Sequence, residues 1–141
     1  MSDRTAREVD FAELAEGEQV SLVQRVTPDV LDRFGALTGD SSPIHMSTDE
    51  ARQAGFRDRV AHGALLAAWA TAIVGMRLPG KRALILDMAM TFHKPVCVGD
   101  EVTITARIER ASAAMRHLTI SLSAAVSGTM HAQGRVGVLV R

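Results

Sequence analysis

The chain has 141 residues, of which 47% are hydrophobic and 23% are charged, so the sequence predicts one globular domain with a single packed core. Sixteen basic residues balance sixteen acidic ones. The basic residues form no cluster that could bind the phosphates of a nucleic acid, so a nucleic-acid partner is not expected. The N-terminus lacks the apolar stretch of a signal peptide and the single cysteine, Cys97, suits a reducing compartment, so we expect a cytoplasmic protein.

The first elements are marked by local signals. Residues 1–17 are predicted to form a polar lead-in, and the alternation in residues 19–26 is typical of a strand. A helix is predicted to begin after Thr27, because a hydroxyl side chain can cap a helix and Pro28 suits the first helical position. It should end at Gly39, which can adopt the left-handed conformation common after a helix.

A second, short helix follows a stiff connector. Ser47 and Glu50 have the spacing of a capping box, and Gly55 provides the stop. Residues 40–46 are therefore predicted to be a tight connector, stiffened by Pro43, which fixes its own φ and pushes the residue before it toward extended conformations.

The third helix is predicted to run from His62-Gly63 to about Met76 and is almost entirely apolar. The apolar run is shorter than the ~20 residues needed to cross a bilayer, so no membrane span is expected. A helix with almost no polar face should be surrounded by protein on most sides, which in one small domain means a sheet wrapped around it.

The second half of the chain changes to a strand pattern. Because the predicted strands are consecutive and joined by short turns, they should pair antiparallel. The predicted fold class is α+β: a single hot-dog domain over residues 18–141, with a curved antiparallel sheet around one long buried helix. The predicted strands are residues 83–96, 101–112, 116–126 and 131–140.

Several of these segments resemble a known family. The stretch FGALTGDSSPIH, residues 34–45, followed by Ala51, resembles the signature of R-specific enoyl-CoA hydratases and MaoC-like dehydratases. It is specific because it combines residue types and spacing over a dozen positions. The similarity covers most of the chain from about Val20 and continues through VAHG at residues 60–63, LPG at 78–80 and FHKPVCVGD at 92–100.

The resemblance implies an activity and an assembly. It implies a homodimer that adds water, in a syn sense, across the double bond of a trans-2-enoyl thioester to give the R-3-hydroxyacyl product, or that runs the reverse dehydration. The acyl group would be carried by CoA or by an acyl carrier protein. No cofactor and no metal are implied.

The resemblance also implies roles for particular residues. Asp40 and His45 match the two catalytic residues that act on one water molecule. Gly63 matches the glycine whose backbone N–H stabilises the thioester oxygen, a role that suits the first turn of a helix. We expect Ser42, which stands where the family has Asn, and His62, which should shape the pocket wall, to contribute to substrate binding.

Thr71, two turns along the same helix from Gly63, matches a position at which some relatives have a polar contact to the site. We include it among the expected substrate-binding residues. A threonine in a helix can instead bond back to its own helix, and this alternative stays open.

The residues alone leave other interpretations open. An Asp after a helix-ending Gly is typical of a turn, and a metal site formed by Asp40, His45 and His62 is not predicted, because D-x4-H is not a recognised ligand spacing. Arg77, Lys81 and Arg82 follow the third helix and could meet the phosphates of a thioester carrier, or could form a solvated loop. The alternative functions are a hot-dog thioesterase and a non-catalytic acyl-binding subunit.

Overall fold

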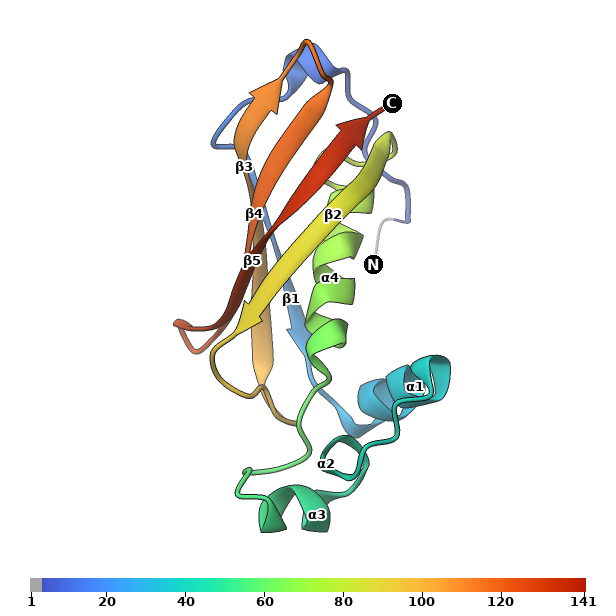
Figure 1. Cartoon of the computed structure of the whole chain (residues 1–141), viewed down its shortest axis with the longest axis vertical. Coiled ribbons are helices and arrows are strands. Elements are labelled where there is room, and N and C mark those ends of the chain that lie inside the picture. Colours follow the sequence, from blue (N-terminus) through green and yellow to red (C-terminus); the bar gives the residue numbers. More distant parts are fainter. Residues whose placement is uncertain (1–3) are drawn as a thin grey trace.

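The computed structural model describes residues 4–141 and places a five-stranded antiparallel sheet along one long helix, with three short helices at one end (Figure 1). The strand order is β1-β3-β4-β5-β2, and the α+β hot-dog class predicted from the sequence is confirmed. The strands are β1 (Gln19–Arg25), β2 (Ala83–Phe92), β3 (Glu101–Ser112), β4 (His117–Val126) and β5 (Thr129–Val140). The helices are α1 (Pro28–Thr38), α2 (Pro43–Met46), α3 (Thr48–Gln53) and α4 (Gly63–Met76), preceded by a 3-10 turn at Phe11–Glu13.

Helix α1 has the boundaries that its local signals predict. The backbone N–H of Val30 donates to the hydroxyl of Thr27 at 3.2 Å, and Pro28 is the first helical residue. Gly39 ends the helix with φ 80°, and its N–H donates to the carbonyl of Gly35. The chain therefore leaves α1 in a fixed direction, and Asp40 is the next residue.

The connector between α1 and α3 is more regular than predicted. Residues 43–46 form one helical turn, α2, in which Pro43 is the first residue. Proline suits this position because its fixed φ is helical and its missing N–H would have no partner there. Four residues are too few to show a helical hydrophobic period, so the sequence pattern gave no sign of α2. Ser47 then caps α3 by accepting from the N–H of Glu50, as predicted.

Helix α4 packs against the inner face of the sheet. Its buried side is formed by Leu65, Leu66, Ala70, Ile73 and Val74. The opposite side, formed by Ala64, Ala68 and Ala72, is exposed. Most residues of α4 are thus buried or half-buried, as expected, and one narrow stripe of the helix stays open within one chain. No helix of residues 4–141 has the length and apolarity to cross a membrane.

Strand β2 ends at Phe92, four residues before its predicted end. The backbone N–H groups of His93 and Lys94 both donate to the carbonyl of His131, so the chain turns out of the ladder there. Pro95 then lacks an N–H and could not continue the pairing. The resulting loop passes close to the start of α4.

The segment before residue 18 differs from a purely polar lead-in. Phe11 and Leu14 are buried and belong to the hydrophobic core, while residues 1–3 lie outside the described part of the chain. Two apolar residues separated by three positions are a weak signal in sequence. They are buried here because the segment crosses the end of the sheet, where the N–H of Gly17 donates to the carbonyl of Ile108.

Candidate active site

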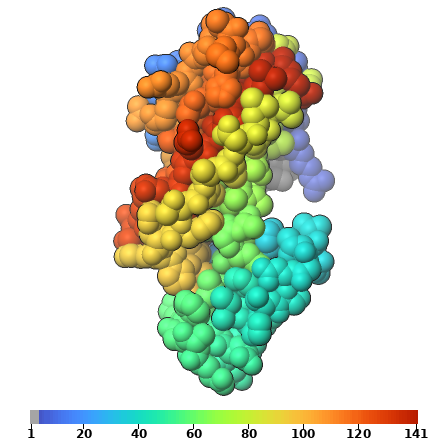
Figure 2. Space-filling model, in the orientation of Figure 1, coloured from blue at the N-terminus to red at the C-terminus, as the bar shows by residue number. Residues whose placement is uncertain are grey.

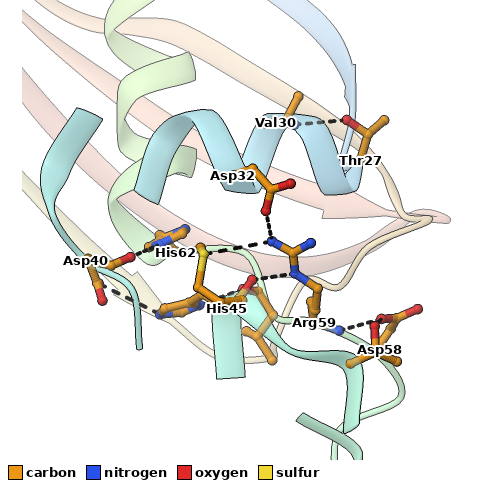
Figure 3. Close-up of polar contacts among 11 residues, drawn as sticks. Thr27, Val30, Asp32, Asp40, His45, Asp58, Arg59 and His62 are labelled. Carbon is orange, nitrogen blue, oxygen red and sulfur yellow. Dashed lines mark hydrogen bonds and ion pairs between the residues drawn. The ribbon is translucent and has the colours of Figure 1, made fainter. Parts of the chain in front are cut away.

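Three polar side chains from different elements meet at the N-terminal end of α4, beside the lobe of short helices visible in Figure 2. Asp40 comes from the loop after α1, His45 from α2, and His62 from the position just before α4 (Figure 3). One donor or acceptor atom from each of the three lies within 4.8 Å of the others. The fold thus brings together residues that are up to 22 positions apart in the sequence.

The backbone N–H and the side chain of Asp40 each form a hydrogen bond with a nearby residue. Its N–H donates to the hydroxyl of Thr38 at 3.2 Å, and its Oδ1 accepts from the N–H of Ser42 at 3.2 Å. The Ser42 backbone N–H lowers the pKa of Asp40 from its ordinary value. Burial opposes this effect, and the charge of His45 and the hydroxyl of Ser42 add to it. The side chain is therefore a carboxylate at neutral pH, and it is 49% exposed.

His45 directs its Nε2 toward Asp40. Its Nδ1 lies 2.6 Å from the carbonyl of Val60. Because a carbonyl only accepts, Nδ1 must carry the proton, and in the neutral ring Nε2 is then a bare acceptor. This Nε2 lies 3.9 Å from Oδ2 of Asp40, and the imidazole is only 13% exposed. The backbone of Val60 thus fixes the tautomer of His45 and the direction of its reactive nitrogen.

The separation between Asp40 and His45 suits a bridging water molecule. At 3.9 Å the two atoms are too far apart for a direct hydrogen bond. Both are acceptors, so neither can donate to the other while the ring is neutral. One water molecule could instead donate one hydrogen to each of them, leaving its oxygen lone pairs free to attack a third group. The spacing therefore leaves room for one water molecule between the two groups.

A cavity of about 350 Å³ opens beside His45 and the first residue of α4. The N–H of Gly63 has no acceptor within its helix, because the first N–H groups of an α-helix are unpaired. The positive end of the helix dipole adds to this potential. A larger hollow of about 600 Å³ lies on the outer face of the sheet but contains none of Asp40, His45 and His62. The smaller cavity is lined by His45, Val60, Ala61, Gly63, Leu66, Phe92, His93, Lys94, Pro95 and Val96.

Gly63 also has a steric reason to be glycine. A Cβ built on it would lie 2.9 Å from Cζ of Phe92, closer than real Cβ atoms come to other groups. The phenyl ring, which is 50% exposed, therefore rests directly on the glycine at the cavity wall. A side chain at this position would have to displace the Phe92 ring.

A buried arginine, which the sequence analysis did not single out, binds the backbone of the element that carries His45. Arg59 is 7% exposed, and its Nε donates to the carbonyl of His45 at 2.6 Å. Its Nη2 forms an ion pair with Asp32 of α1 (Figure 3). Arg59 thus ties α2 to α1. No local pattern distinguishes it from the other arginines nearby.

The three residues expected to bind substrate differ in where they lie relative to Asp40 and the cavity. Ser42 lies two residues after Asp40, and its backbone N–H donates to the Asp40 carboxylate. His62 is 2% exposed and does not line the cavity. Thr71 lies on α4 outside the cavity, and its hydroxyl donates to the carbonyl of Ala68 at 2.7 Å. The backbone contact of Thr71 matches the alternative in which it bonds to its own helix.

The three polar groups are poorly arranged for a metal ion. Zinc holds nitrogen and oxygen donors at about 2.0–2.2 Å, so its donors usually lie closer together than 3.9 Å. The hydrogen bonds of one nitrogen of His45 and one of His62 to backbone carbonyls are common in metal-bound histidines too, so the argument rests on the separation of the donors. We therefore keep the prediction that this site works without a metal.

The basic residues at the other end of α4 interact with the N-terminal segment. Lys81 pairs with Glu8 at 3.1 Å, and Arg82 pairs with both Glu8 and Asp10. Helix α4 has 14 residues and rises ~1.5 Å per residue. These cations therefore lie about 20 Å along the helix from Gly63, and their charges are partly neutralised.

The relatives found by comparison with known proteins agree with one another. The family model described as "MaoC like domain" matches residues 11–130. The (R)-specific enoyl-CoA hydratase of Rhodospirillum rubrum is 31% identical over 130 residues, which cover 92% of this chain and 90% of that protein. The 3-hydroxybutyryl-CoA dehydratase of Methylorubrum extorquens is 28% identical over 130 residues, which cover 92% and 83%.

A solved structure agrees with the sequence comparison. The chain is similar to the (R)-hydratase from A. caviae involved in PHA biosynthesis, with a TM-score of 0.88 and 28% identity. The superposition covers 92% of this chain and 98% of that one. The likeness therefore extends over the sheet, α4 and the lobe of short helices together.

Proposed function

Because the chain belongs to the MaoC-like domain family, we propose that it catalyses the reversible syn hydration of trans-2-enoyl thioesters to (R)-3-hydroxyacyl thioesters. The observation that carries this proposal is the pair of acceptors, Asp40 Oδ2 and His45 Nε2, held 3.9 Å apart next to the cavity that Gly63 lines. Hydration needs water activated at one point and positive potential at another, and the proposal assigns the first to the Asp40–His45 pair and the second to the N–H of Gly63.

The proposed reaction uses one water molecule and three groups of the protein. The water oxygen attacks C3 of the enoyl group while the water gives a proton to the Asp40–His45 pair. Electron density moves onto the thioester oxygen, where the N–H of Gly63 stabilises the enolate. A proton then returns from the pair to C2 on the same face, which gives the syn product. No redox step or cofactor is needed.

The carrier of the acyl group is either CoA or an acyl carrier protein, since both present the same thioester. The carrier must approach from the open side of the cavity, between α4 and the loop after β2. The exposed side chains of His93 and Lys94 line this side. We expect the site to bind the thioester end of the substrate, with most of the carrier outside.

The test is a direct assay with crotonyl-CoA, in which loss of enoyl absorbance and release of free thiol are measured on the same sample. A hydratase should consume the enoyl group with no thiol released. Thiol release would support the thioesterase alternative. Binding of the thioester without either signal would support a non-catalytic acyl-binding subunit. Parallel assays with the enoyl group carried by CoA and by an acyl carrier protein identify the carrier.

Replacing Ser42 with Ala should move the acid limb of the kcat/KM profile to higher pH. The active form needs Asp40 ionised, and the lowered pKa of Asp40 keeps it ionised as the pH falls. The variant loses the hydroxyl that contributes to this lowering but keeps the backbone N–H, which contributes most. Asp40 should then become protonated at a higher pH than in the parent. The check is kcat/KM against pH for both proteins, since this ratio reports groups of the free enzyme. An unchanged acid limb would contradict the assignment of Asp40 as the ionised group.

We propose that two copies of the chain form a homodimer through α4 and β2. The exposed side of α4 consists of the small residues Ala64, Ala68 and Ala72. Strand β2 lies at the end of the sheet and carries exposed Leu84 and Leu86. An unpaired edge strand with exposed apolar side chains is usually covered in a stable protein. A second copy would cover both surfaces.

Replacing Leu86 with Glu should shift the protein from dimer to monomer, because a charge would be placed in an apolar contact. Light scattering coupled to size exclusion measures the mass directly. The matched control is Met115→Glu, which adds the same charge at an exposed apolar residue in the β3–β4 turn. If the Leu86 variant keeps the mass of the parent, the proposed interface is wrong.

A further inference from the structure

His62 lies at the centre of the site but does not line the cavity. Its ring stacks on the ring of His45, with centroids 3.9 Å apart and planes inclined by 22°. Its Nε2 lies 3.0 Å from the backbone carbonyl of Asp40 and must donate to it. A single buried side chain therefore touches both members of the water-activating pair (Figure 3).

We infer that His62 is a positioning residue that sets the separation of Asp40 and His45, rather than a substrate contact. This inference rests on the hydratase function proposed above. His62 would act through two contacts, the N–H that holds the Asp40 backbone and the ring face that holds the His45 imidazole. It would not itself exchange a proton with the substrate.

The hydrogen-bonding of His62 argues against a purely structural role. Its Nδ1 is buried without a hydrogen-bond partner among the described residues. A buried polar atom without a partner destabilises the fold, so packing alone would favour an apolar ring of similar size at this position. His62 also makes no side-chain cap to α4, although it precedes the first helical residue. The contact that an apolar ring could not provide here is the hydrogen bond to the Asp40 carbonyl.

The contact matters because Asp40 has few other restraints. Its side chain is half exposed, and its loop connects α1 to a helix of only four residues. The N–H of Asp40 is held by Thr38, the last residue of α1, whereas its carbonyl is held by His62, which directly precedes α4. The hydrogen bond from His62 is therefore a direct link between this loop and the helix that carries the Gly63 N–H. A misplacement of about 1 Å in such a site can cost about a hundredfold in rate.

The test compares two substitutions that separate the two contacts. His62→Phe keeps the stacked ring but removes the N–H and the unpaired Nδ1. His62→Gln keeps an N–H near the position of Nε2 but loses the ring. The control is Phe34→Leu, because Phe34 packs on His62 at 4.9 Å and contacts neither Asp40 nor His45 through a ring or hydrogen bond.

The positioning role predicts opposite changes in rate and stability. For His62→Phe, kcat for crotonyl-CoA should fall by about ten- to a hundredfold with KM nearly unchanged, while Tm stays equal or rises. His62→Gln should recover part of the lost kcat, and Phe34→Leu should leave kcat near that of the parent. Unchanged kcat in His62→Phe would overturn the inference. So would a rise in KM alone, which indicates a substrate contact, or a loss of kcat only in proportion to a loss of folded protein.

A structural readout separates failure of this inference from failure of the proposed function. If the parent does not hydrate enoyl thioesters, the proposed function is wrong, and crystal structures of parent and His62→Phe then decide the inference. The distance from Asp40 Oδ2 to His45 Nε2, 3.9 Å here, should change between them if His62 sets it. An unchanged distance would overturn the positioning role.

Discussion

Replacing Asp40 with Asn should slow the hydration of crotonyl-CoA by about a hundredfold or more while the fold is retained. Asn has nearly the same shape and can still accept the N–H of Ser42 through its amide oxygen, but it cannot take a proton from water. General acid/base groups typically contribute about 10²–10⁴ in rate. The measurement is kcat from the loss of enoyl absorbance, with Tm measured on the same preparation.

The matched control for this substitution is Asp49→Asn. Asp49 is an exposed residue in the first turn of α3 and is not part of the site. The control changes the net charge of the protein by the same amount, so it separates the loss of a charge from the loss of this carboxylate. Near-parent activity in the Asp40 variant would remove Asp40 from the mechanism.

Replacing His45 with Gln should also lower kcat by about a hundredfold or more. The amide can form hydrogen bonds near the position of Nε2, but it does not accept a proton at neutral pH. The variant also loses the hydrogen bond from Nδ1 to the carbonyl of Val60 and the stack on His62. A decrease in Tm is therefore expected here, and the rate must be normalised to the folded fraction. His117→Gln, on β4, is the control.

The two substitutions together test whether the pair acts on one water molecule. If Asp40 and His45 hold the same water, the second substitution should cost much less than the first, because groups that act as a unit are strongly non-additive. Independent roles would instead multiply the two losses. A double variant with the product of the single effects would therefore contradict the shared water, even if each residue is essential.

The main elements were predictable where their causes are local. Thr27, Pro28 and Gly39 determine α1 through contacts within a few residues, and the apolar composition of residues 63–76 marks α4 as a core helix. Helix α2 escaped prediction because a single turn shows no hydrophobic period. The burial of Phe11 and Leu14 was also missed, because it depends on where the chain crosses the end of the sheet.

Only part of the candidate site could be predicted from the sequence. The pattern from residue 34 to 45 drew attention to Asp40 and His45 through its resemblance to a family. It contained no sign of Arg59, which binds the His45 carbonyl 14 positions away and Asp32 27 positions away. A buried arginine looks like any surface arginine in sequence, because its burial depends on partners that are distant in the chain.

By itself the sequence determined the boundaries of α1, α3 and α4, the antiparallel strands and the residue types available for acid/base chemistry, since these depend on side-chain period, caps and composition. Only the tertiary structure decided which nitrogen of His45 faces Asp40, through the Val60 carbonyl 15 positions away. It also placed His62 against the Asp40 carbonyl and left one face of α4 open. The physical reason is that hydrogen bonds and stacking between segments far apart in the chain impose no period on either segment.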